Sequence, residues 1–382
     1  MTSSRISDIQ PFHVMALLAR AKELEAQGKD IVHMEIGEPD FPTPAPIVEA
    51  GIKAISKGDV HYTPATGMFE LREAIADFYR VRYDVNVEAS RVVVTPGASG
   101  ALMLALGVIM QEGDEVLLAD PGYPCNRNFV RFLSGKTSSI AVDASSGYQL
   151  TLEHLKHNWK KNTVAAIVAS PSNPTGTLIS QSELSAMARF VKEQGGYLIV
   201  DEIYHGLVYD GDYNTALAID NNIIVINSFS KYFNMTGWRL GWIVAPEKLV
   251  NDMDKLAQNI FLAAPTPAQH AALAAFNDET IKVLESHKEE FKKRRDFLLP
   301  ALKKLGFKID VEPQGAFYIY ANCEKFSSDS FQFCDDLLEN IGVAITPGKD
   351  FGANNANIHV RIAYTTSLEQ LQEGIKRLNE YL

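Results

Sequence analysis

Residues 222–242 read NIIVINSFSKYFNMTGWRLGW, a stretch that joins an apolar run to a loop carrying a lysine and an arginine. The run at 222–228 is apolar through its centre, which is typical of a short strand buried on both faces of a sheet. Lys231 follows that strand, and Arg239 comes eight residues later. A lone lysine usually extends its amine into water, so the neighbouring motifs must decide whether Lys231 has a chemical role.

Other apolar runs of the same kind alternate with helical patterns along the chain. They predict strands at 91–96, 114–120, 163–170, 196–202 and 240–246. Periodic apolar residues predict helices at 8–30, 44–57, 67–83, 98–110, 123–133, 150–158 and 180–194. Because continuous apolar strands belong to sheets covered on both faces, we expect an α/β protein with a mostly parallel sheet covered by helices.

The alternation ends near residue 280, where a long charged helix at 280–304 leads into a different pattern. Residues 306–322 and 358–364 there predict strands of a smaller α+β domain. We therefore expect three parts: an N-terminal segment at 1–45 that joins the small domain, a large domain at 46–280, and a small C-terminal domain at 281–382.

The composition excludes several classes of protein. The chain has 382 residues, a net charge of −11 and a pI of about 5.4, which disfavours a nucleic-acid surface. Its longest apolar run, 101–110, holds ten residues and is too short to span a bilayer. The N-terminus lacks the apolar region of a signal peptide. Because the three cysteines are scattered, we expect a cytoplasmic protein with reduced thiols and no metal site.

Polar residues follow the predicted strands, at the edge where open parallel sheets bind their ligands. TPGASGAL at 95–102 combines a glycine-rich turn with a helix N-terminus, which suits a phosphate, although it is neither a dinucleotide fingerprint nor a P-loop. DPGYPCNRN at 120–128 holds Tyr123 in a rigid turn. That tyrosine is either a half-buried core residue or an aromatic face for a flat ligand.

The next strand ends add an amide, a carboxylate and an amine. Asn173 lies in SPSNPTGT at 170–177, which is either a common Asn-Pro turn or a rigid mount for an amide donor. Asp201 ends a buried run and needs a partner, because an unpaired buried charge is costly. The hydroxyls of Ser228 and Ser230, with the guanidinium of Arg239, are typical phosphate ligands beside the Lys231 amine.

Taken together, these strand ends match the needs of pyridoxal phosphate, a phosphorylated pyridine aldehyde. That cofactor needs a lysine for its imine, an aspartate opposite the pyridine nitrogen, and hydrogen bonds to its ring oxygen.

The whole set of motifs resembles the pyridoxal-phosphate-dependent aminotransferases of fold type I, the class I/II or aspartate-aminotransferase-like family. The resemblance covers nearly the whole chain, and it implies a mostly parallel seven-stranded sheet in the large domain at 46–280, which would bind the cofactor. Asp201 falls 28 residues after Asn173, and Lys231 falls 30 residues after Asp201. The motifs are IGEPDFPTP at 36–44, HYTPATGMFELREAI at 61–75, TPGASGAL, DPGYP, SPSNPTGT, VDEIYHGLVY, SFSKYFNMTGWRLGW and HVRIAY at 359–364.

The resemblance implies roles for the residues of the cofactor site. Lys231 is expected to form the imine and then to move the proton of the substrate Cα. Asp201 is expected to pair with the pyridine N–H, while Tyr204 and Asn173 bond the ring oxygen and Tyr123 stacks on the ring. The phosphate is expected to contact Ala98, Ser99, Ser228, Ser230 and Arg239.

The resemblance also implies a substrate site and a partner. Arg361 is expected to clamp the substrate α-carboxylate with help from Asn173 and Gly37; structural pairing across the sheet of the small region is the alternative. Tyr62 is expected to reach the phosphate of a neighbouring subunit, which implies a homodimer with active sites at its interface; local packing is the alternative. His61 and His205 receive no chemical role, and the charges of 280–295 and Lys255 are expected on a solvated face.

The reaction implied is a ping-pong transfer of an amino group from an L-amino acid to a 2-oxo acid. A carbon–sulfur β-lyase or another elimination enzyme on the same scaffold is the alternative, since both keep the same lysine, aspartate and arginine. A non-enzymatic cofactor-binding protein is a remote alternative. The donor stays open among aspartate or glutamate, alanine and aromatic amino acids. Arg127 or Arg131 would suit an acidic side chain, whereas Phe12, Ile36, Phe41 and Phe317 would suit an apolar one.

Overall fold

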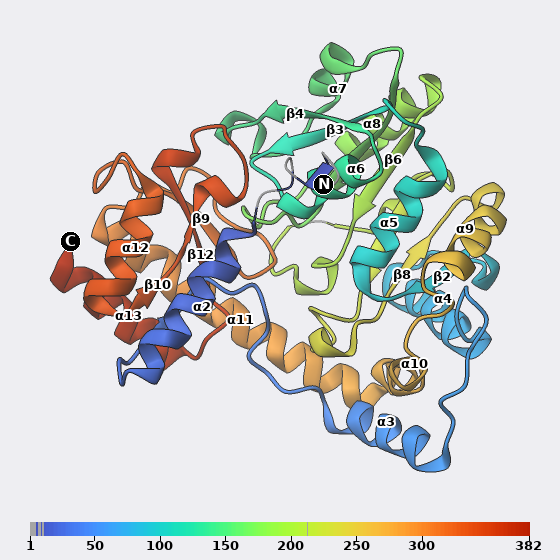
Figure 1. Ribbon diagram of the computed structural model, residues 1–382, viewed down its shortest axis with the longest axis horizontal. Helices are drawn as coiled ribbons and strands as arrows, with labels where there is room; N and C mark the ends of the chain where they lie inside the picture. Colours follow the sequence, from blue (N-terminus) through green and yellow to red (C-terminus); the bar gives the residue numbers. More distant parts are fainter. Residues whose placement is uncertain (1–4, 7–8, 10, 212) are drawn as a thin grey trace.

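The computed structural model describes residues 5–6, 9, 11–211 and 213–382, and one large sheet forms the centre of this part (Figure 1). Among these residues the sheet has seven strands in the order β2-β8-β7-β6-β5-β3-β4. The pairs from β4 to β7 are parallel, and β8 runs antiparallel to both of its neighbours. The predicted α/β class and mostly parallel seven-stranded sheet are therefore confirmed.

The strands and helices of this part lie within two residues of the predicted bounds, apart from β4, α9 and α10, which were not predicted. The strands are β2 (Val92–Thr95), β3 (Glu115–Asp120), β4 (Lys136–Ala141), β5 (Thr163–Ala169), β6 (Tyr197–Asp201), β7 (Ile224–Ser228) and β8 (Gly241–Val244). The helices are α3 (Ala45–Lys57), α4 (Phe69–Tyr83), α5 (Gly97–Ile109), α6 (Pro124–Phe132), α7 (Leu152–Asn158), α8 (Gln181–Glu193), α9 (Glu247–Ile260) and α10 (Thr266–Leu273).

The central strands of the large sheet are buried on both faces, as their continuous apolar sequences require. In β6, Leu198 and Val200 belong to one apolar cluster, whereas Ile199 between them belongs to a second cluster on the other face. The second cluster includes residues of α5 and α9, and the first includes residues of α4, α8 and α10. This alternation follows from the two-residue period of a strand.

The edge strand β4 escaped prediction because its sequence carries no apolar run. It reads KTSSIA, and most of its residues are exposed, with Ile140 buried. An edge strand pairs on one side only, so its backbone hydrogen bonds to β3 define it rather than its side chains.

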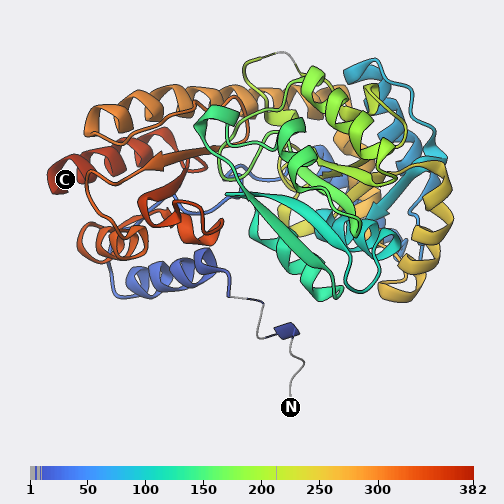
Figure 2. The same cartoon turned by 90° about the horizontal axis from the view of Figure 1, so that it is seen from above.

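A smaller sheet lies at the other end of the molecule, where the C-terminal part of the chain gathers (Figures 1 and 2). Its order is β11 (Thr346–Pro347), β12 (His359–Ala363) and β9 (Tyr318–Asn322), all antiparallel. The helices of this region are α12 (Ser330–Ile341) and α13 (Leu368–Tyr381). The predicted strand at 358–364 matches β12, but of the strand predicted at 306–322 the structure forms only β9.

Residues 306–317 fail to form a regular strand because their backbone bonds to other segments. The N–H groups of Gln314 and Gly315 both donate to the carbonyl of Gly176, and Gly315 forms an isolated bridge with Val208. A Cβ on Gly315 would lie 2.7 Å from Pro171, so this stretch lies against the loop that carries Asn173.

The N-terminal segment packs against the smaller region. α2 (His13–Ala26) is shorter than the pattern at 8–30, of which residues 8 and 10 lie outside the described residues. β1 (Val32–His33) pairs in parallel with β10 (Val343–Ala344). This pairing joins the N-terminal segment to the smaller region, while the division at 45 and 280 stays a prediction.

The long helix α11 (Asp278–Leu305) links the two ends of the molecule, and part of its charge is buried, contrary to the expected solvated face. Arg294 and Arg295 are only 3% and 7% exposed. Arg294 donates to Asp40 at 2.8 Å, and Arg295 pairs with Asp210 at 2.5 Å. These arginines therefore fasten α11 to loops that lie far away in the sequence, whereas Lys255 is exposed as expected. Within the described chain, none of the helices combines the length and the apolar character needed to cross a bilayer.

Candidate active site

The carboxyl ends of the large-sheet strands, together with the start of α2 and the loop at 36–38, surround a cavity of about 300 Å³. Among its lining residues are almost all of the predicted site residues: Gly37, Ala98, Ser99, Tyr123, Asn173, Asp201, Tyr204, Ser228, Ser230, Lys231, Arg239 and Arg361. Tyr62 does not line it and is 83% exposed. Of the apolar candidates, Phe12 and Ile36 line the cavity, whereas Phe41 and Phe317 do not.

The amine of Lys231 lies inside this cavity and is easier to deprotonate than an ordinary lysine. Its Nζ donates to the carbonyl of Gly37 at 2.6 Å. Burial lowers the pKa of Lys231 to about 8; Glu38 opposes this shift, and Arg361 adds to it. A lysine with this pKa holds a substantial neutral fraction near pH 7, and the neutral form is the nucleophile.

Asp201 ends β6 and is buried at the wall of the same cavity. Its Oδ1 accepts the N–H of Ile203 at 3.0 Å, its only hydrogen bond among the described residues. Burial raises the pKa of Asp201 to about 6, while the bond from Ile203 and the charge of Lys231 oppose the rise. Its second oxygen therefore has the capacity to accept a proton donor from within the cavity.

An anion cradle forms where β2 enters α5. Gly97 is left-handed with φ +70°, and a Cβ there would lie 2.6 Å from Nη2 of Arg239. A Cβ on Gly241 would lie 2.8 Å from the backbone nitrogen of Ala98. These two glycines allow the arginine loop to approach the first turn of α5, whose N–H groups have no partners within the helix. The cradle suits a phosphate group.

Arg361 of β12 is held from several sides although it is buried. Its Nη1 donates to Oδ1 of Asn173 at 3.0 Å, and its Nη2 donates to the carbonyl of Glu35. The guanidinium carbon lies 4.4 Å from the ring centre of Tyr318 and 4.8 Å from that of Phe351. Its Nε is buried with no hydrogen-bond partner among the described residues, so the fork has donor capacity left for an anion.

Sequence reasoning singled out Gly37 but missed the backbone carbonyls of residues 35–37, which order the site. Its three carbonyls accept hydrogen bonds in turn from Arg361, Thr365 and Lys231. Backbone acceptors leave no pattern in a sequence; the motif IGEPDFPTP at 36–44 contains two of these three carbonyls.

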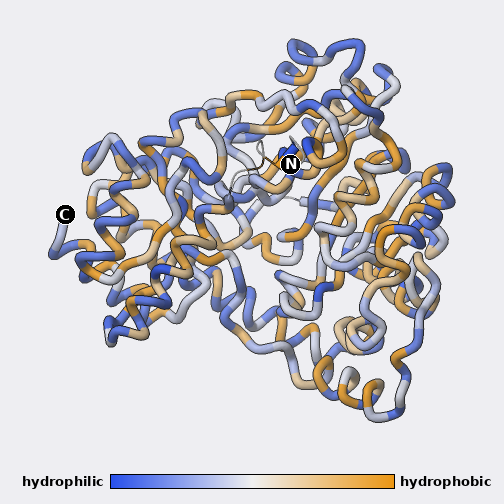
Figure 3. Tube along the Cα trace, viewed as in Figure 1, coloured by the Kyte–Doolittle hydropathy of each residue, from blue (hydrophilic) through white to orange (hydrophobic). Residues whose placement is uncertain are grey.

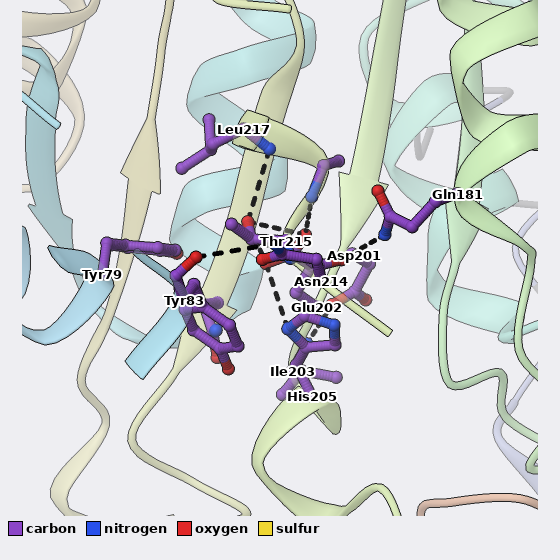
Figure 4. A network of polar contacts seen from close by, with 12 residues as sticks. Tyr79, Tyr83, Gln181, Asp201, Glu202, Ile203, His205, Asn214, Thr215 and Leu217 are labelled. Carbon is purple, nitrogen blue, oxygen red and sulfur yellow. Dashed lines mark hydrogen bonds and ion pairs between the residues drawn. The ribbon is translucent and has the colours of Figure 1, made fainter. Parts of the chain in front are cut away.

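A second missed residue is Tyr318, whose hydroxyl lies 2.8 Å from that of Tyr204. A third is Glu202, which lies beside Asp201 in a polar network (Figure 4). Oε1 of Glu202 accepts the N–H of Ala216 at 2.7 Å, and its carboxyl also accepts the Thr215 hydroxyl. The nearest signal in the sequence was the DE pair at 201–202.

Burial dominates the titration of this network. Burial raises the pKa of Glu202 to about 8 and lowers the pKa of the neighbouring His205 to about 3. Nδ1 of His205 lies 3.6 Å from Glu202, beyond hydrogen-bond distance. Both side chains are therefore neutral at pH 7, and His205 has a structural place rather than a chemical one, as expected.

We predict that Glu202→Gln becomes more stable relative to the parent protein as the pH rises from about 5 to about 8.5. The folded-state pKa of Glu202 is raised above its unfolded value, so its stabilising proton is lost as pH rises towards about 8. Glutamine keeps an acceptor and does not ionise. Thermal unfolding should show the difference in Tm growing by at least about 2 °C across this range. A constant difference would contradict a buried neutral Glu202.

Arg127 and Arg131 lie outside the cavity of Lys231. Both line a neighbouring cavity of about 280 Å³, together with His13, Lys349 and Asp350. Arg127 donates to the backbone carbonyl of Asp350 at 3.1 Å, and Phe12 is common to both cavities.

Comparison with known proteins identifies the family. The family model described as aminotransferase class I and II matches residues 29–378. The chain belongs to the class I and II aminotransferases. It is 40% identical to the (5-formylfuran-3-yl)methyl phosphate transaminase of Methanocaldococcus jannaschii, over the full length of both chains. It is 37% identical to the valine–pyruvate aminotransferase of Mycobacterium tuberculosis, over 98% of this chain and 97% of the relative.

A solved aminotransferase structure from Mycobacterium tuberculosis superposes on the chain with a TM-score of 0.97 at 36% identity, covering 100% of this chain and 99% of the other. The chain is thus a fold-type-I aminotransferase, in a family that uses pyridoxal phosphate. The relatives are named as aminotransferases, so the lyase alternative is not favoured.

Proposed function

We propose that this aminotransferase binds pyridoxal 5'-phosphate through Lys231 and transfers an amino group from an L-amino acid to a 2-oxo acid in two half-reactions. The observation that carries the proposal is a buried lysine of lowered pKa, close enough to Arg361 and Arg239 for both to affect that pKa. When bound, the cofactor supplies a carbonyl for amines and a pyridine ring that accepts electrons from the substrate Cα.

The residues of the cavity fit this cofactor. The N–H groups of Ala98 and Ser99, with Ser228, Ser230 and Arg239, would hold its phosphate. The open carboxylate of Asp201 would accept a hydrogen bond from the protonated pyridine nitrogen, and Tyr123 would stack on the ring. Tyr204 and Asn173 would donate to the ring oxygen; the Asn173 carbonyl already accepts from Arg361, which leaves its NH₂ as the donor.

The substrate carboxylate would bind to Arg361, whose orientation is fixed before the substrate arrives. Asn173, Glu35 and the ring of Tyr318 hold its guanidinium, so little conformational entropy is lost on binding. Lys231 would then take the proton from the substrate Cα and return it, because its lowered pKa lets the amine serve as a base near neutral pH.

We propose further that the preferred amino donor has an apolar side chain. Phe12, Val14, Met15, Leu18 and Ile36 form an apolar wall of the cavity. The cations among its described lining residues are Lys231, Arg239 and Arg361. In the proposal above they bind the cofactor, its phosphate and the substrate α-carboxylate, respectively. A second carboxylate would therefore meet apolar side chains, which do not compensate its desolvation. The names of the relatives differ in substrate, so this proposal rests on the wall itself.

A spectroscopic panel tests both proposals. Purified protein with cofactor should show a visible band that bleaches on mixing with single L-amino acids and no 2-oxo acid. We expect the second-order rate of bleaching for valine, leucine or methionine to exceed that for aspartate by at least about tenfold, roughly 1.4 kcal/mol. A faster reaction with aspartate would contradict the apolar preference. Absence of the band after cofactor addition would contradict the cofactor assignment, and pyruvate and ammonia without an acceptor would indicate a lyase.

We propose that the protein is a homodimer in the cytoplasm. α3 alternates in hydropathy along its length (Figure 3) and exposes Ile52 and Ile55. Val60, Tyr62 and Phe69 in the following segment are also more than half exposed. The carbonyl of His61 accepts a bond from Thr266 at 2.7 Å, which places this segment beside α10. An apolar surface of this kind supports a second copy of the chain as its partner, with Tyr62 reaching the partner's phosphate site. Three free cysteines support a reducing compartment.

A further inference from the structure

The hydroxyls of Tyr204 and Tyr318 form an isolated pair at the wall of the active-site cavity. They lie 2.8 Å apart, and among the described residues each is the only hydrogen-bond partner of the other. Both side chains are at most 5% exposed, and both line the cavity. Two hydroxyls that share one hydrogen bond have a second proton to give. Because both side chains line the cavity, an acceptor bound there can take a hydrogen bond from that proton.

Gly37 makes room for the hydroxyl of Tyr318. A Cβ on Gly37 would lie 2.0 Å from Oη of Tyr318 and 3.0 Å from its ring carbon Cζ. Any other residue at position 37 would therefore displace the hydroxyl that reaches Tyr204. The same glycine offers its carbonyl to Nζ of Lys231, so Tyr318 lies against the segment that orients the lysine.

The ring of Tyr318 has a separate contact. The guanidinium carbon of Arg361 lies 4.4 Å from its centre, within the range of a cation–π interaction. β9 and β12 are neighbouring antiparallel strands, so this contact is built into the small sheet. One side chain thus touches Tyr204 on the cofactor side of the cavity and Arg361 on the substrate side.

We propose that Tyr318 is a positioning residue for both halves of the site. Its hydroxyl donates to Tyr204 and so directs the Tyr204 proton to the cofactor ring oxygen, while its ring holds Arg361 ready for the substrate carboxylate. The inference rests on the proposed function, because it needs an ionised ring oxygen in front of Tyr204. With such an acceptor present, Tyr204 donates outward and Tyr318 supplies the proton between them; consecutive hydrogen bonds of this kind strengthen one another.

Other charged and titratable groups also surround this pair, and all remain in the variants below. Arg361 and Tyr123 act on Tyr204, while Asp201 and Lys231 line the same cavity.

The test measures the cofactor in the loaded protein without substrate. Its visible band should titrate with pH, and the midpoint reports how strongly the ionised ring oxygen is stabilised. We expect Tyr318→Phe to raise this midpoint by about 0.5 to 1 pH unit. In a Tyr204→Phe background, Tyr318→Phe should have no further effect on the midpoint. The hydrogen bond from Tyr204 to the ring oxygen, which Tyr318 supports, is already absent there. Equal shifts in both backgrounds, or no shift, would overturn the role of the hydroxyl.

Tyr320→Phe is the matched control, since Tyr320 lies on the same strand and its buried hydroxyl has no partner among the described residues. Its midpoint should equal that of the parent protein; a shift would mean that the effect is structural and would overturn the assignment. If the parent protein shows no band at all, the proposed function fails instead, so the two failures are distinguishable.

The ring is tested separately through substrate affinity. Tyr318→Phe keeps the ring, so the KM for the amino donor should stay within about twofold, whereas Tyr318→Leu should raise it about tenfold. Equal KM values in the two variants would overturn the role of the ring in holding Arg361. If Tyr318→Leu does not fold, the pH titration of the visible band in Tyr318→Phe still tests the role of the hydroxyl.

Discussion

Lys231→Ala is expected to abolish transamination, with a fall in kcat of at least about 10⁴-fold, because one amine both attaches the cofactor and moves the substrate proton. Fold should survive, since the substitution removes a buried cation whose burial already lowers its pKa. Circular dichroism and Tm would establish that the variant is folded. Turnover would be measured with the best donor of the amino-acid panel.

Lys255→Ala provides the matched control, because Lys255 is exposed on α9. It should retain parental turnover. Retention of activity in Lys231→Ala would refute the proposed mechanism, because it would show that turnover does not need the Lys231 amine.

The lowered pKa of Lys231 gives the same prediction a second readout. In cofactor-free protein the rate at which the visible band appears after cofactor addition should rise with pH and level off above about 8. An ordinary lysine, with a pKa of about 10.4, would still be gaining rate at pH 9. A profile that rises unchanged past pH 9 would show that the cavity does not depress the pKa of this amine.

The sequence predicted the sheet and most of the site because their signals are local. Each buried strand is one apolar run, and its polar residue follows immediately, as Asp201 follows 196–200. Once a parallel sheet is inferred, the ends of its strands must meet at one edge. The strand-end argument therefore predicts that residues distant in sequence, such as Asn173 and Lys231, lie near one another, and both line the cavity.

The parts that escaped prediction depend on contacts without a local signal. Tyr318 meets Tyr204 across 114 residues of sequence, and nothing in GAFYIYAN distinguishes it from Tyr320 on the same strand. Arg294 and Arg295 were expected at the surface, because a run of charges on a helix is usually solvated; their burial follows from Asp40 and Asp210 on distant loops. Arg127 and Arg131 follow Tyr123 closely, yet they line a different cavity.

Asp201→Ala is expected to lower kcat by about 10³-fold while the protein still folds and binds the cofactor. Asp201 supplies the carboxylate that lines the cavity at the end of β6. Because burial raises its pKa to about 6, a cation facing it would stabilise its ionised form. The protonated pyridine nitrogen of the cofactor would be such a cation. Without the carboxylate that proton is lost, and the ring accepts electrons from the substrate Cα far less well.

Variants of Asp201 and of the neighbouring Glu202 distinguish loss of charge at position 201 from general disruption of β6. Asp201→Asn preserves the shape of Asp201 but not its charge, so its activity should fall nearly as far as that of Asp201→Ala. Glu202→Gln alters a carboxyl that burial holds neutral, and it should retain turnover within a few fold. Single-turnover bleaching by the preferred amino acid measures the chemical step directly. A near-parental rate in Asp201→Asn would mean that the ring nitrogen needs no charged partner and that Asp201 has been assigned the wrong role.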